Sequence, residues 1–526
     1  MEWWQSGVVY QIYPRSFADA DGDGIGDLAG ILSRVEYLAD TLGIDAVWLS
    51  PFYPSPQADF GYDVADYTDV DPVYGTLADF AALVAACHDR GIRVIVDFVP
   101  NHSSDRHGWF LQSRSARDDP KRDWYTWRDP APDGGPPNNW ISVFGGPAWE
   151  LDEATGQYYL HSFLKEQPDL NWRNTEVRAA MHDVLRFWLD RGVDGFRIDV
   201  AHRIAKDPEL RSNPLADAAT SGPGKDHGEY DTLEHLHDAG HPDVHEYFRE
   251  IRAVLDEYDD RYSIGEIHEY DWQRWASYIG EGDELHQVFD FSLLFAPWEA
   301  AEIRARIAGQ EDALPPGGWP NHVLGNHDEP RIARRLGSDH ARLAALVLLT
   351  TRGTPTLYYG DELGMTQPDL PVDRQLDPWA QTSDVAGRDG CRTPMQWESA
   401  VHAGFSPPEA VRTWLPVDGA PGTDVASQLA DPDSMLNFYR RCLTFRRASA
   451  ALRGGDYRPR NDVPAGVLAF TRSRDGETVT VVLNLGDEPA TATARGTVVL
   501  ATDRAREGER TNGTAVLAPA EGIVFG

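Results

Sequence analysis

Short apolar runs alternate with longer amphipathic stretches along most of the chain. The amphipathic stretches carry apolar residues at helical spacing, and three of them stop at a glycine, Gly43, Gly91 or Gly192, the residue type expected just past a helix C-terminus. They predict helices over residues 28–42, 77–90 and 176–190. The apolar runs are typical of buried strands and predict strands at residues 8–12, 46–49, 93–98, 195–199, 262–265, 287–289, 322–324 and 356–359.

This alternation predicts the fold class. Repeated strand–helix units imply a parallel sheet, and eight of them imply an α/β fold, a closed (β/α)8 barrel. Residues 101–172 interrupt the rhythm with a stretch rich in Pro, Gly, Asp, Trp and Tyr. It is too long for a plain loop, so we expect an inserted subdomain over the mouth of the barrel. From residue 451 onward, short alternating strands predict a C-terminal antiparallel β-sandwich. The predicted domains are the barrel (1–100 and 173–450), the insertion (101–172) and the sandwich (451–526).

Charge and composition exclude several classes of partner. The net charge of −36 would repel phosphates, so we expect neither nucleic acid nor an anionic membrane as a partner. No stretch approaches the ~20 apolar residues of a membrane span, and the chain does not open with the basic and apolar regions of a signal peptide. Cys87, Cys391 and Cys442 form no CxxC pair. We expect buried thiols in a reducing compartment, the cytoplasm. Nothing in the composition specifies an oligomeric state.

The fourth predicted strand ends in the sequence GFRID, residues 195–199. Side chains two positions apart share one side of a strand, which places Arg197 beside Asp199. A guanidinium close by favours the ionised form of a carboxylate. Taken alone, this pair fits a catalytic nucleophile and a structural ion pair equally well.

Other strand ends supply further charged groups, and the C-terminal ends of barrel strands carry the chemistry of this fold. The fifth strand leads to Glu266, and the seventh leads to His327 and Asp328; His102 follows the third. Mutual repulsion among three carboxylates raises the pKa of at least one, which gives a protonated acid beside an ionised group. Cleavage of a glycosidic bond needs that arrangement. A divalent metal site is the alternative, but Arg197 already supplies positive charge there.

Seven short segments occur in an order shared with one known family. They are residues 7–14 (GVVYQIYP), 97–102 (DFVPNH), 167–171 (QPDLN), 195–199 (GFRID), 265–266 (GE), 326–328 (NHD) and 353–355 (GTP). On these segments the chain resembles the α-amylase family of retaining glycoside hydrolases, glycoside hydrolase family 13, over essentially its whole length. Residues 167–171 and 388–397 make it most similar to the exo-acting α-glucosidases and oligo-1,6-glucosidases of that family.

The resemblance implies a role for each strand-end residue. Asp199 would be the nucleophile that forms a β-glucosyl-enzyme, and Glu266 would be the general acid and then the base, with a raised pKa. Asp328 would hold the 2- and 3-hydroxyls of the sugar. His102 and His327 would hydrogen-bond sugar hydroxyls, and Arg197 would keep Asp199 charged.

A further segment, residues 58–63 (ADFGYD), matches the family's clamp for the non-reducing end. Tyr62 would stack on the glucose ring. Asp59 would bind the terminal 4-hydroxyl together with an arginine, for which we favour Arg392 over Arg388. This pairing would close the pocket and make the enzyme exo-acting, with glucose released from short α-glucosides and some glucosyl transfer to other acceptors.

Residues 19–27 place acids at every second position with glycines between them, a pattern that can wrap a hard cation in oxygens. The twelfth position of the loop is Gly30 rather than Glu, so it is not an EF-hand. Similar loops in the family's oligo-1,6-glucosidases hold Ca²⁺, which implies a structural site; whether Ca²⁺ or Mg²⁺ fills it stays open. The implied ligands are Asp19, Asp21, Asp23, the Ile25 carbonyl and Asp27.

The linkage preference and two rival functions stay open. Val200 follows the expected nucleophile Asp199. In related enzymes a valine at this position accompanies α-1,6 preference, but residues 201–203 depart from the commonest forms of that pattern. Both α-1,4 and α-1,6 linkages therefore fit. A glucoside isomerase or transglucosylase, of the trehalose- or sucrose-isomerising type, would share every catalytic residue. The non-catalytic transporter-subunit branch of the fold has a membrane helix and has lost catalytic acids, unlike this chain.

Overall fold

A barrel of parallel strands forms the centre of the molecule. The structure is a computed structural model that describes residues 1–216, 227–382, 387–417, 419 and 421–526. Eight parallel strands form one sheet in the order β10-β11-β1-β2-β3-β7-β8-β9, which confirms the predicted (β/α)8 architecture. The strands are β1 (Val9–Ile12), β2 (Ala46–Leu49), β3 (Arg93–Phe98), β7 (Gly195–Ile198), β8 (Tyr262–Gly265), β9 (Gln287–Val288), β10 (Asn321–Val323) and β11 (Thr354–Tyr358).

The barrel is nearly closed. Within the described residues, β9 and β10 are the outer strands of the sheet order and share no ladder. The side chain of Gln287 crosses the gap, because its Nε2 donates to the carbonyl of Pro320 at 2.9 Å and to Oγ1 of Thr354 at 3.1 Å. A buried glutamine amide thus joins the two outer strands where backbone pairing is missing.

Helices surround the strands, as the alternating pattern predicts. The expected helices at 77–90 and 176–190 are α4 and α6. The helix expected over 28–42 is interrupted: α3 ends at Arg34, whose ψ of 4° leaves the helical region, and a π-helical turn, η1, follows. The helices are α1 (Trp3–Ser6), α2 (Pro14–Phe17), α3 (Leu28–Ser33), η1 (Tyr37–Leu42), α4 (Leu77–Asp89), α6 (Thr175–Leu189), α7 (Val244–Leu255), α8 (Trp272–Ser277), α9 (Ser292–Phe295), α10 (Ala300–Ala313) and α11 (Ile332–Thr350).

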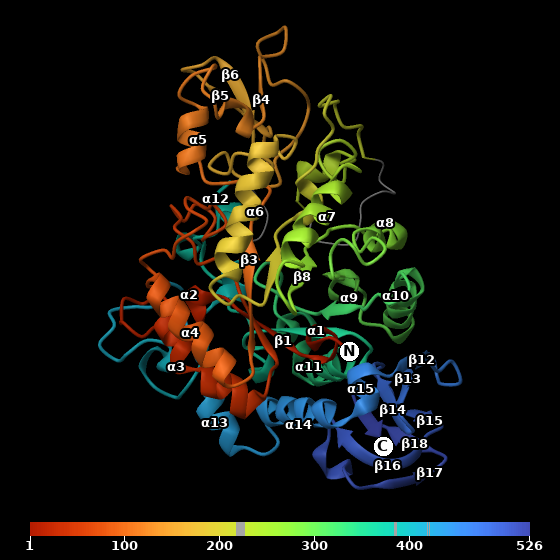
Figure 1. Cartoon of the computed structure of the whole chain (residues 1–526). Coiled ribbons are helices and arrows are strands. Elements are labelled where there is room, and N and C mark those ends of the chain that lie inside the picture. Colours follow the sequence, from red (N-terminus) through yellow and green to blue (C-terminus); the bar gives the residue numbers. More distant parts are fainter. Residues whose placement is uncertain (217–226, 383–386, 418, 420) are drawn as a thin grey trace.

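The predicted insertion lies between β3 and α6, at one end of the barrel (Figure 1). Its strands form a small antiparallel sheet in the order β4-β6-β5, packed around Phe110, Trp127 and Tyr159. The bounds 101–172 stay a prediction. The elements are α5 (Gly108–Ser113), η2 (Arg122–Trp124), β4 (Trp127–Arg128), β5 (Trp149–Asp152) and β6 (Gln157–Leu160).

Short helical elements follow several barrel strands and connect the barrel to the last domain. Among them, α14 packs against α11, and η3 comes directly after the strand that carries Arg197. They are η3 (Ala201–Arg203), η4 (Tyr230–Thr232), η5 (Asp361–Leu363), η6 (Val372–Arg374), α12 (Pro378–Thr382), η7 (Asp389–Arg392), η8 (Val401–Gly404), α13 (Val425–Ala430), α14 (Met435–Ala448) and α15 (Ala450–Gly454).

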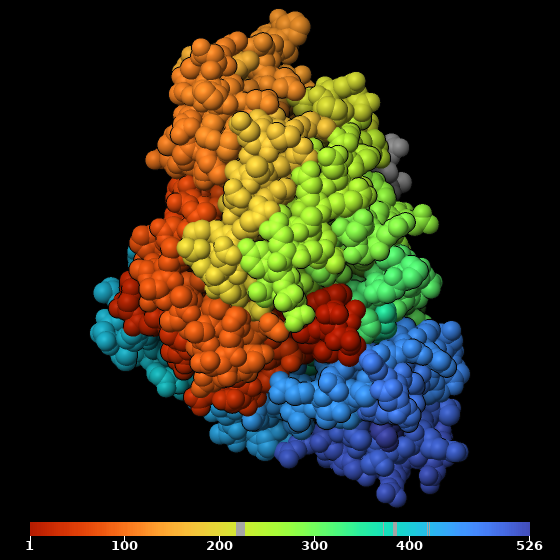
Figure 2. All heavy atoms as spheres, viewed as in Figure 1, coloured from red at the N-terminus to blue at the C-terminus, as the bar shows by residue number. Residues whose placement is uncertain are grey.

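A β-sandwich ends the chain at the opposite end from the insertion (Figure 2). Its six-stranded sheet has the order β12-β13-β14-β19-β16-β17, and β15 pairs with β18 in a second sheet. Along β13 the side chains alternate: Val467 and Ala469 pack between the two sheets, whereas Leu468 and Phe470 join the large core of the barrel. The elements are β12 (Asp456–Pro459), β13 (Val467–Arg474), β14 (Glu477–Asn484), β15 (Ala490–Ala492), β16 (Arg495–Ala501), η9 (Arg504–Arg506), β17 (Arg510–Asn512), β18 (Ala515–Leu517) and β19 (Gly522–Phe525).

No helix in the described part of the chain combines the length and the apolar character needed to cross a membrane.

Arg472 on β13 ties the sandwich to the barrel. It is fully buried, and burial lowers its pKa to about 9. Its guanidinium donates to the carbonyl of Thr350 at 2.8 Å and to those of Leu452 and Gly455 at 3.0 Å. One side chain thus joins the end of the barrel helix α11 to α15 and to the residue before β12.

We expect Arg472→Met to destabilise the protein by roughly 2–4 kcal/mol, because it leaves buried carbonyls without donors. Thermal unfolding followed by circular dichroism measures the effect as a lower midpoint. Arg458→Met on the neighbouring strand is the matched control, because Arg458 is 73% exposed and pairs with Asp456 at the surface, where an ion pair contributes little. Equal midpoints for the two variants would contradict this role of Arg472.

Candidate active site

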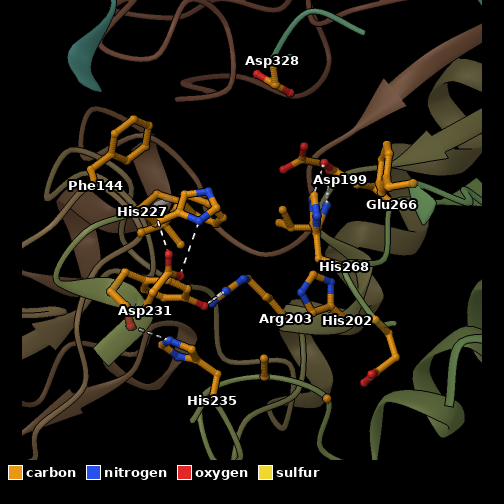
Figure 3. A pocket seen from close by; sticks show the side chains of 18 of the residues that line it. Phe144, Asp199, His202, Arg203, His227, Asp231, His235, Glu266, His268 and Asp328 are labelled. Atoms are coloured by element: carbon orange, nitrogen blue, oxygen red, sulfur yellow. Dashed lines mark hydrogen bonds and ion pairs between the residues drawn. The ribbon is translucent and has the colours of Figure 1, made fainter. Parts of the chain in front are cut away.

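A cavity of about 370 Å³ opens where the barrel strands end, at the place that the sequence predicts. Figure 3 shows Asp199 and Glu266 close together in it, with Asp328 set apart. The other predicted residues divide into those that line the cavity and two arginines, Arg197 and Arg392, which are 2% and 0% exposed and lie behind the lining. Seven of the nine predicted residues line the cavity: Asp59, Tyr62, His102, Asp199, Glu266, His327 and Asp328.

One guanidinium joins three carboxylates at the base of the cavity. Nη1 of Arg197 donates to Asp199 at 2.7 Å and to Asp97 at 2.6 Å, and Nη2 donates to Glu266 at 2.6 Å. The register of the barrel explains the third partner, because Asp97 on β3 pairs directly with Arg197 on β7. Asp97 is not among the predicted site residues. Aligning the third and fourth predicted strands as parallel neighbours would have placed it opposite Arg197.

The backbone directly after Asp199 is strained. Val200 has φ 34° and ψ 46°, a left-handed conformation that a β-branched residue rarely adopts. The strained turn directs the N–H of Val200 at Oε2 of Glu266, 3.0 Å away, and the N–H of Ala201 at the backbone carbonyl of Glu266, 2.9 Å away. The strain is therefore used to hold the general-acid candidate in place.

The protonation pattern of the two central carboxyls is the reverse of the prediction. Burial raises the pKa of Asp199 well above its ordinary value, because Arg197 offsets this only in part and Glu266 adds repulsion. Burial acts on Glu266 too, but there Arg197 and His268 outweigh it and lower the pKa. Arg197 and the N–H of Val200 both donate to Oε2 of Glu266. The directions of the two pKa shifts therefore favour the ionised form at Glu266 more than at Asp199.

The arginine that pairs with Asp59 is not the one that we favour from the sequence. Arg388 pairs with Asp59 at 2.6 Å, whereas Arg392 donates to Asp328 at 2.8 Å and to the His327 carbonyl at 2.7 Å. The Asp59–Arg392 pairing is therefore wrong, and Arg388 also lines the cavity. A carboxylate without a sequence signal, Asp377, holds Arg388 in position through Nε at 2.8 Å.

Both predicted histidines are neutral over the ordinary pH range. Burial lowers the pKa of His102 to about 4 and that of His327 to about 3. The ring of Tyr62 lies parallel to that of His327, with centroids 5.4 Å apart, and its hydroxyl is 2.7 Å from Nε2. The side chain of Gln167, from the segment QPDLN, lies 3.1 Å from His102 and 3.2 Å from Asp59.

Asp328 keeps its charge. Burial alone would raise its pKa, but His327 and the two arginines Arg388 and Arg392 outweigh that effect and lower it. Asp328 is thus an anion that faces the cavity, set apart from Asp199 and Glu266 (Figure 3).

Aromatic residues, histidines and one arginine line the other side of the cavity, and the sequence analysis does not identify them. They come from loops after several barrel strands and from the insertion, where no periodic pattern marks them. One of them, Arg203, hydrogen-bonds the hydroxyl of Tyr230. The residues are Phe144, Phe163, His202, Arg203, His227, Tyr230, His235, His268, Phe291, Phe295 and Trp379.

The acidic loop near the N-terminus brings together three of its four predicted carboxylates. Oxygens of Asp19, Asp21 and Asp27 lie within 4.8 Å of one another. Asp23 is not in this group; its Oδ1 accepts from the N–H of Ile25 at 2.7 Å. Asp27 also caps α3, because its Oδ1 accepts from the N–H of Gly30 at 2.6 Å.

The family follows from a comparison with known proteins. A model of the alpha amylase catalytic domain matches residues 11–455, and a domain of unknown function matches residues 453–525. The chain belongs to the alpha-amylase family. As a member of this family it is a glycoside hydrolase.

Relatives in the alpha-amylase family share most of the length of the chain. A probable alpha-glucosidase of Rhizobium meliloti is 43% identical, over 93% of this chain and 90% of that protein. An oligo-1,6-glucosidase of Heyndrickxia coagulans is 37% identical, over 92% of both. Among solved structures, the alpha-glucosyl transfer enzyme XgtA has a TM-score of 0.93 at 39% identity, covering 100% of this chain and 99% of that one. A trehalulose synthase has 0.90 at 36% identity, with both chains covered fully.

We expect Arg197→Lys to lower kcat/KM by about 10²-fold or more, because a single ammonium cannot hold three carboxylates in place. Arg197 lowers the pKa of Asp199 both by its charge and by its hydrogen bond. Lysine keeps the charge but lacks the fork that bonds several carboxylates at once, so we expect that pKa to rise. If Asp199 acts as an ionised nucleophile, the acid limb of the kcat/KM profile then moves to higher pH. Rates measured across pH with an aryl α-glucoside test this.

Arg186→Lys is the control, because Arg186 pairs with Glu257 at the surface. An acid limb that stays in place in Arg197→Lys would contradict the electrostatic role.

Proposed function

We propose that the protein is a retaining, exo-acting α-glucosidase that releases glucose from the non-reducing end of short α-glucosides. The observation that carries this proposal is the bridge of Arg197 between Asp199 and Glu266. A single guanidinium that contacts both carboxyls supports the close spacing of a retaining enzyme, about 5–5.5 Å between carboxyl groups, over the wider spacing of an inverting one.

In the proposed mechanism Asp199 attacks the anomeric carbon while the bond to the aglycone oxygen breaks, and Glu266 gives its proton to that oxygen. Glu266 then takes a proton from water, which attacks the β-glucosyl-enzyme and restores Asp199. The mechanism needs Asp199 ionised and the proton on Glu266, whereas the pKa of Asp199 is raised and that of Glu266 lowered. The guanidinium between the two carboxyls contacts both and can stabilise either one as the anion, so substrate binding would shift the proton to Glu266.

The clamp supports exo action on short substrates. Asp59 and Arg388 form a buried ion pair at one side of the cavity, which suits the terminal 4-hydroxyl of a sugar. Tyr62, held parallel to His327, offers an aromatic face for the glucose ring, and Asp328 an anion for the 2- and 3-hydroxyls. A cavity of about 370 Å³ lies in the range of small-ligand sites.

The relatives support hydrolysis and leave isomerisation as an alternative function. Those named as alpha-glucosidases and oligo-1,6-glucosidases favour hydrolysis of α-1,4 or α-1,6 linkages. The solved transfer enzyme and the trehalulose and isomaltulose synthases favour transglucosylation as a side activity, or isomerisation as the second candidate.

Cys87, Cys391 and Cys442 are buried and form no disulfide, which supports a reducing, cytoplasmic location.

A panel of maltose, isomaltose, trehalose and sucrose tests the function. We expect glucose from maltose, isomaltose or both, released first as the α-anomer, and glucose plus fructose from sucrose; conversion of sucrose mainly to an isomer would favour the second candidate.

We expect Asp199→Asn and Glu266→Gln to lower kcat on maltose by roughly 10²–10⁴-fold. Near-wild-type turnover by either variant would refute the mechanism.

We also propose that the acidic loop holds a structural Ca²⁺. The three clustered carboxylates supply the hard oxygen ligands that this ion prefers, and the proposed ligands are Asp19, Asp21, Asp27, Asp23 and the Ile25 carbonyl.

A bound ion stabilises the folded state, so we expect EDTA to lower the midpoint of thermal unfolding and added Ca²⁺ to restore it. Asp21→Asn should start from a lower midpoint and respond to neither treatment. Adding Mg²⁺ in place of Ca²⁺ distinguishes the two ions. An unchanged wild-type midpoint in EDTA would rule out the site.

A further inference from the structure

His268 contacts the acid/base carboxylate directly. It stands two residues after Glu266, beyond the end of β8, and lines the cavity. Its Nε2 lies 3.1 Å from Oε1 of Glu266, and its side chain is 43% exposed. Figure 3 shows His268 and His202 side by side on the same side of the cavity as Glu266.

The two oxygens of Glu266 have different surroundings. Oε2 accepts hydrogen bonds from Nη2 of Arg197 at 2.6 Å and from the N–H of Val200 at 3.0 Å. Both partners are donors only, so a proton on Oε2 would face two N–H groups. Within the described residues, Oε1 has a single hydrogen-bond partner, Nε2 of His268. The proton that Glu266 transfers must therefore sit on Oε1.

An imidazole has a nitrogen that can serve both states of this oxygen. With its hydrogen on Nε2 it donates to the ionised carboxylate, and in the other tautomer it accepts from the carboxylic acid. The ring is held in place, because it stacks on Phe291 with centroids 4.9 Å apart and planes 12° apart. The neighbours on η3 are His202, whose pKa burial lowers well below its ordinary value, and the cation Arg203.

We propose that His268 is a positioning residue for the acid/base step: its Nε2 holds Oε1 of Glu266, the oxygen that carries the transferable proton, in line with the aglycone side of the cavity. This inference rests on the proposed acid/base role of Glu266. In this role His268 neither gives nor takes the transferred proton, and contacts only the carboxyl that does. It acts by keeping Oε1 oriented while the proton leaves and returns.

Two variants separate the hydrogen bond from the ring. His268→Phe keeps an aromatic ring to stack on Phe291 but cannot bond Oε1, whereas His268→Gln loses the ring and keeps a group that can donate or accept. Each is measured as kcat/KM on 2,4-dinitrophenyl α-glucoside, whose leaving group needs no proton, and on methyl α-glucoside or maltose, whose leaving groups do.

We expect His268→Phe to lower kcat/KM about 10- to 100-fold on the poor leaving groups and to leave the dinitrophenyl substrate little changed. His268→Gln should restore most of the loss. Equal losses on both kinds of substrate, no loss at all, or no rescue by glutamine would overturn the proposal.

Glu266→Gln is the reference for the mechanism beneath the proposal. It should show the same dependence on leaving group, in stronger form. If it shows none, the acid/base role of Glu266 fails and the proposal fails with it. If Glu266→Gln shows the dependence and His268→Phe does not, only the role of His268 fails.

Discussion

The guanidinium of Arg197 is the interaction on which the site depends. Burying one carboxylate costs several kcal/mol unless a partner compensates it, and here three are buried around a single cation. One positive charge does not offset three negative ones. The pKa of Asp97, raised to about 6, and the raised pKa of Asp199 reflect this imbalance together with the burial of both groups. In the proposed mechanism the same imbalance favours a proton held within the cluster.

The same imbalance extends along the clamp. Arg388 and Arg392 share three further carboxylates, those of Asp59, Asp328 and Asp377. Here the cations prevail at Asp328, whose pKa is lowered, while burial keeps the pKa of Asp59 raised. The carboxyls at the cavity therefore differ in pKa. Burial raises the pKa of each, and the positions of Arg197, Arg388 and Arg392 determine how far this is offset.

Sequence reasoning is strongest where a residue's role depends on the barrel itself. The glycine stops and apolar runs predict the strands to within a few residues, and the strand ends then bring Asp199, Glu266 and Asp328 to one cavity. It is weaker where a residue's role depends on contacts between segments distant in sequence. Arg388 and Arg392 lie in one segment after the last barrel strand, and only the fold shows that Asp377 directs Arg388 to Asp59. The protonation order of Asp199 and Glu266 also depends on the turn at Val200, which no local pattern indicates.

The side of the cavity beyond Glu266, where the aglycone would bind, could not be predicted from the sequence for a related reason. The groups for the glucosyl unit stand on strand ends and are fixed by hydrogen bonds to one another. The opposite lining comes from loops, η4 and the region around His268, and its contacts are aromatic stacking and single hydrogen bonds. Known structures named as transfer enzymes and isomerases keep this fold at TM-scores of 0.89 to 0.93. With the barrel so similar, the mechanism that we propose makes the fate of the glucosyl-enzyme depend on what these loop residues admit beside Glu266: water, a second sugar or the released aglycone.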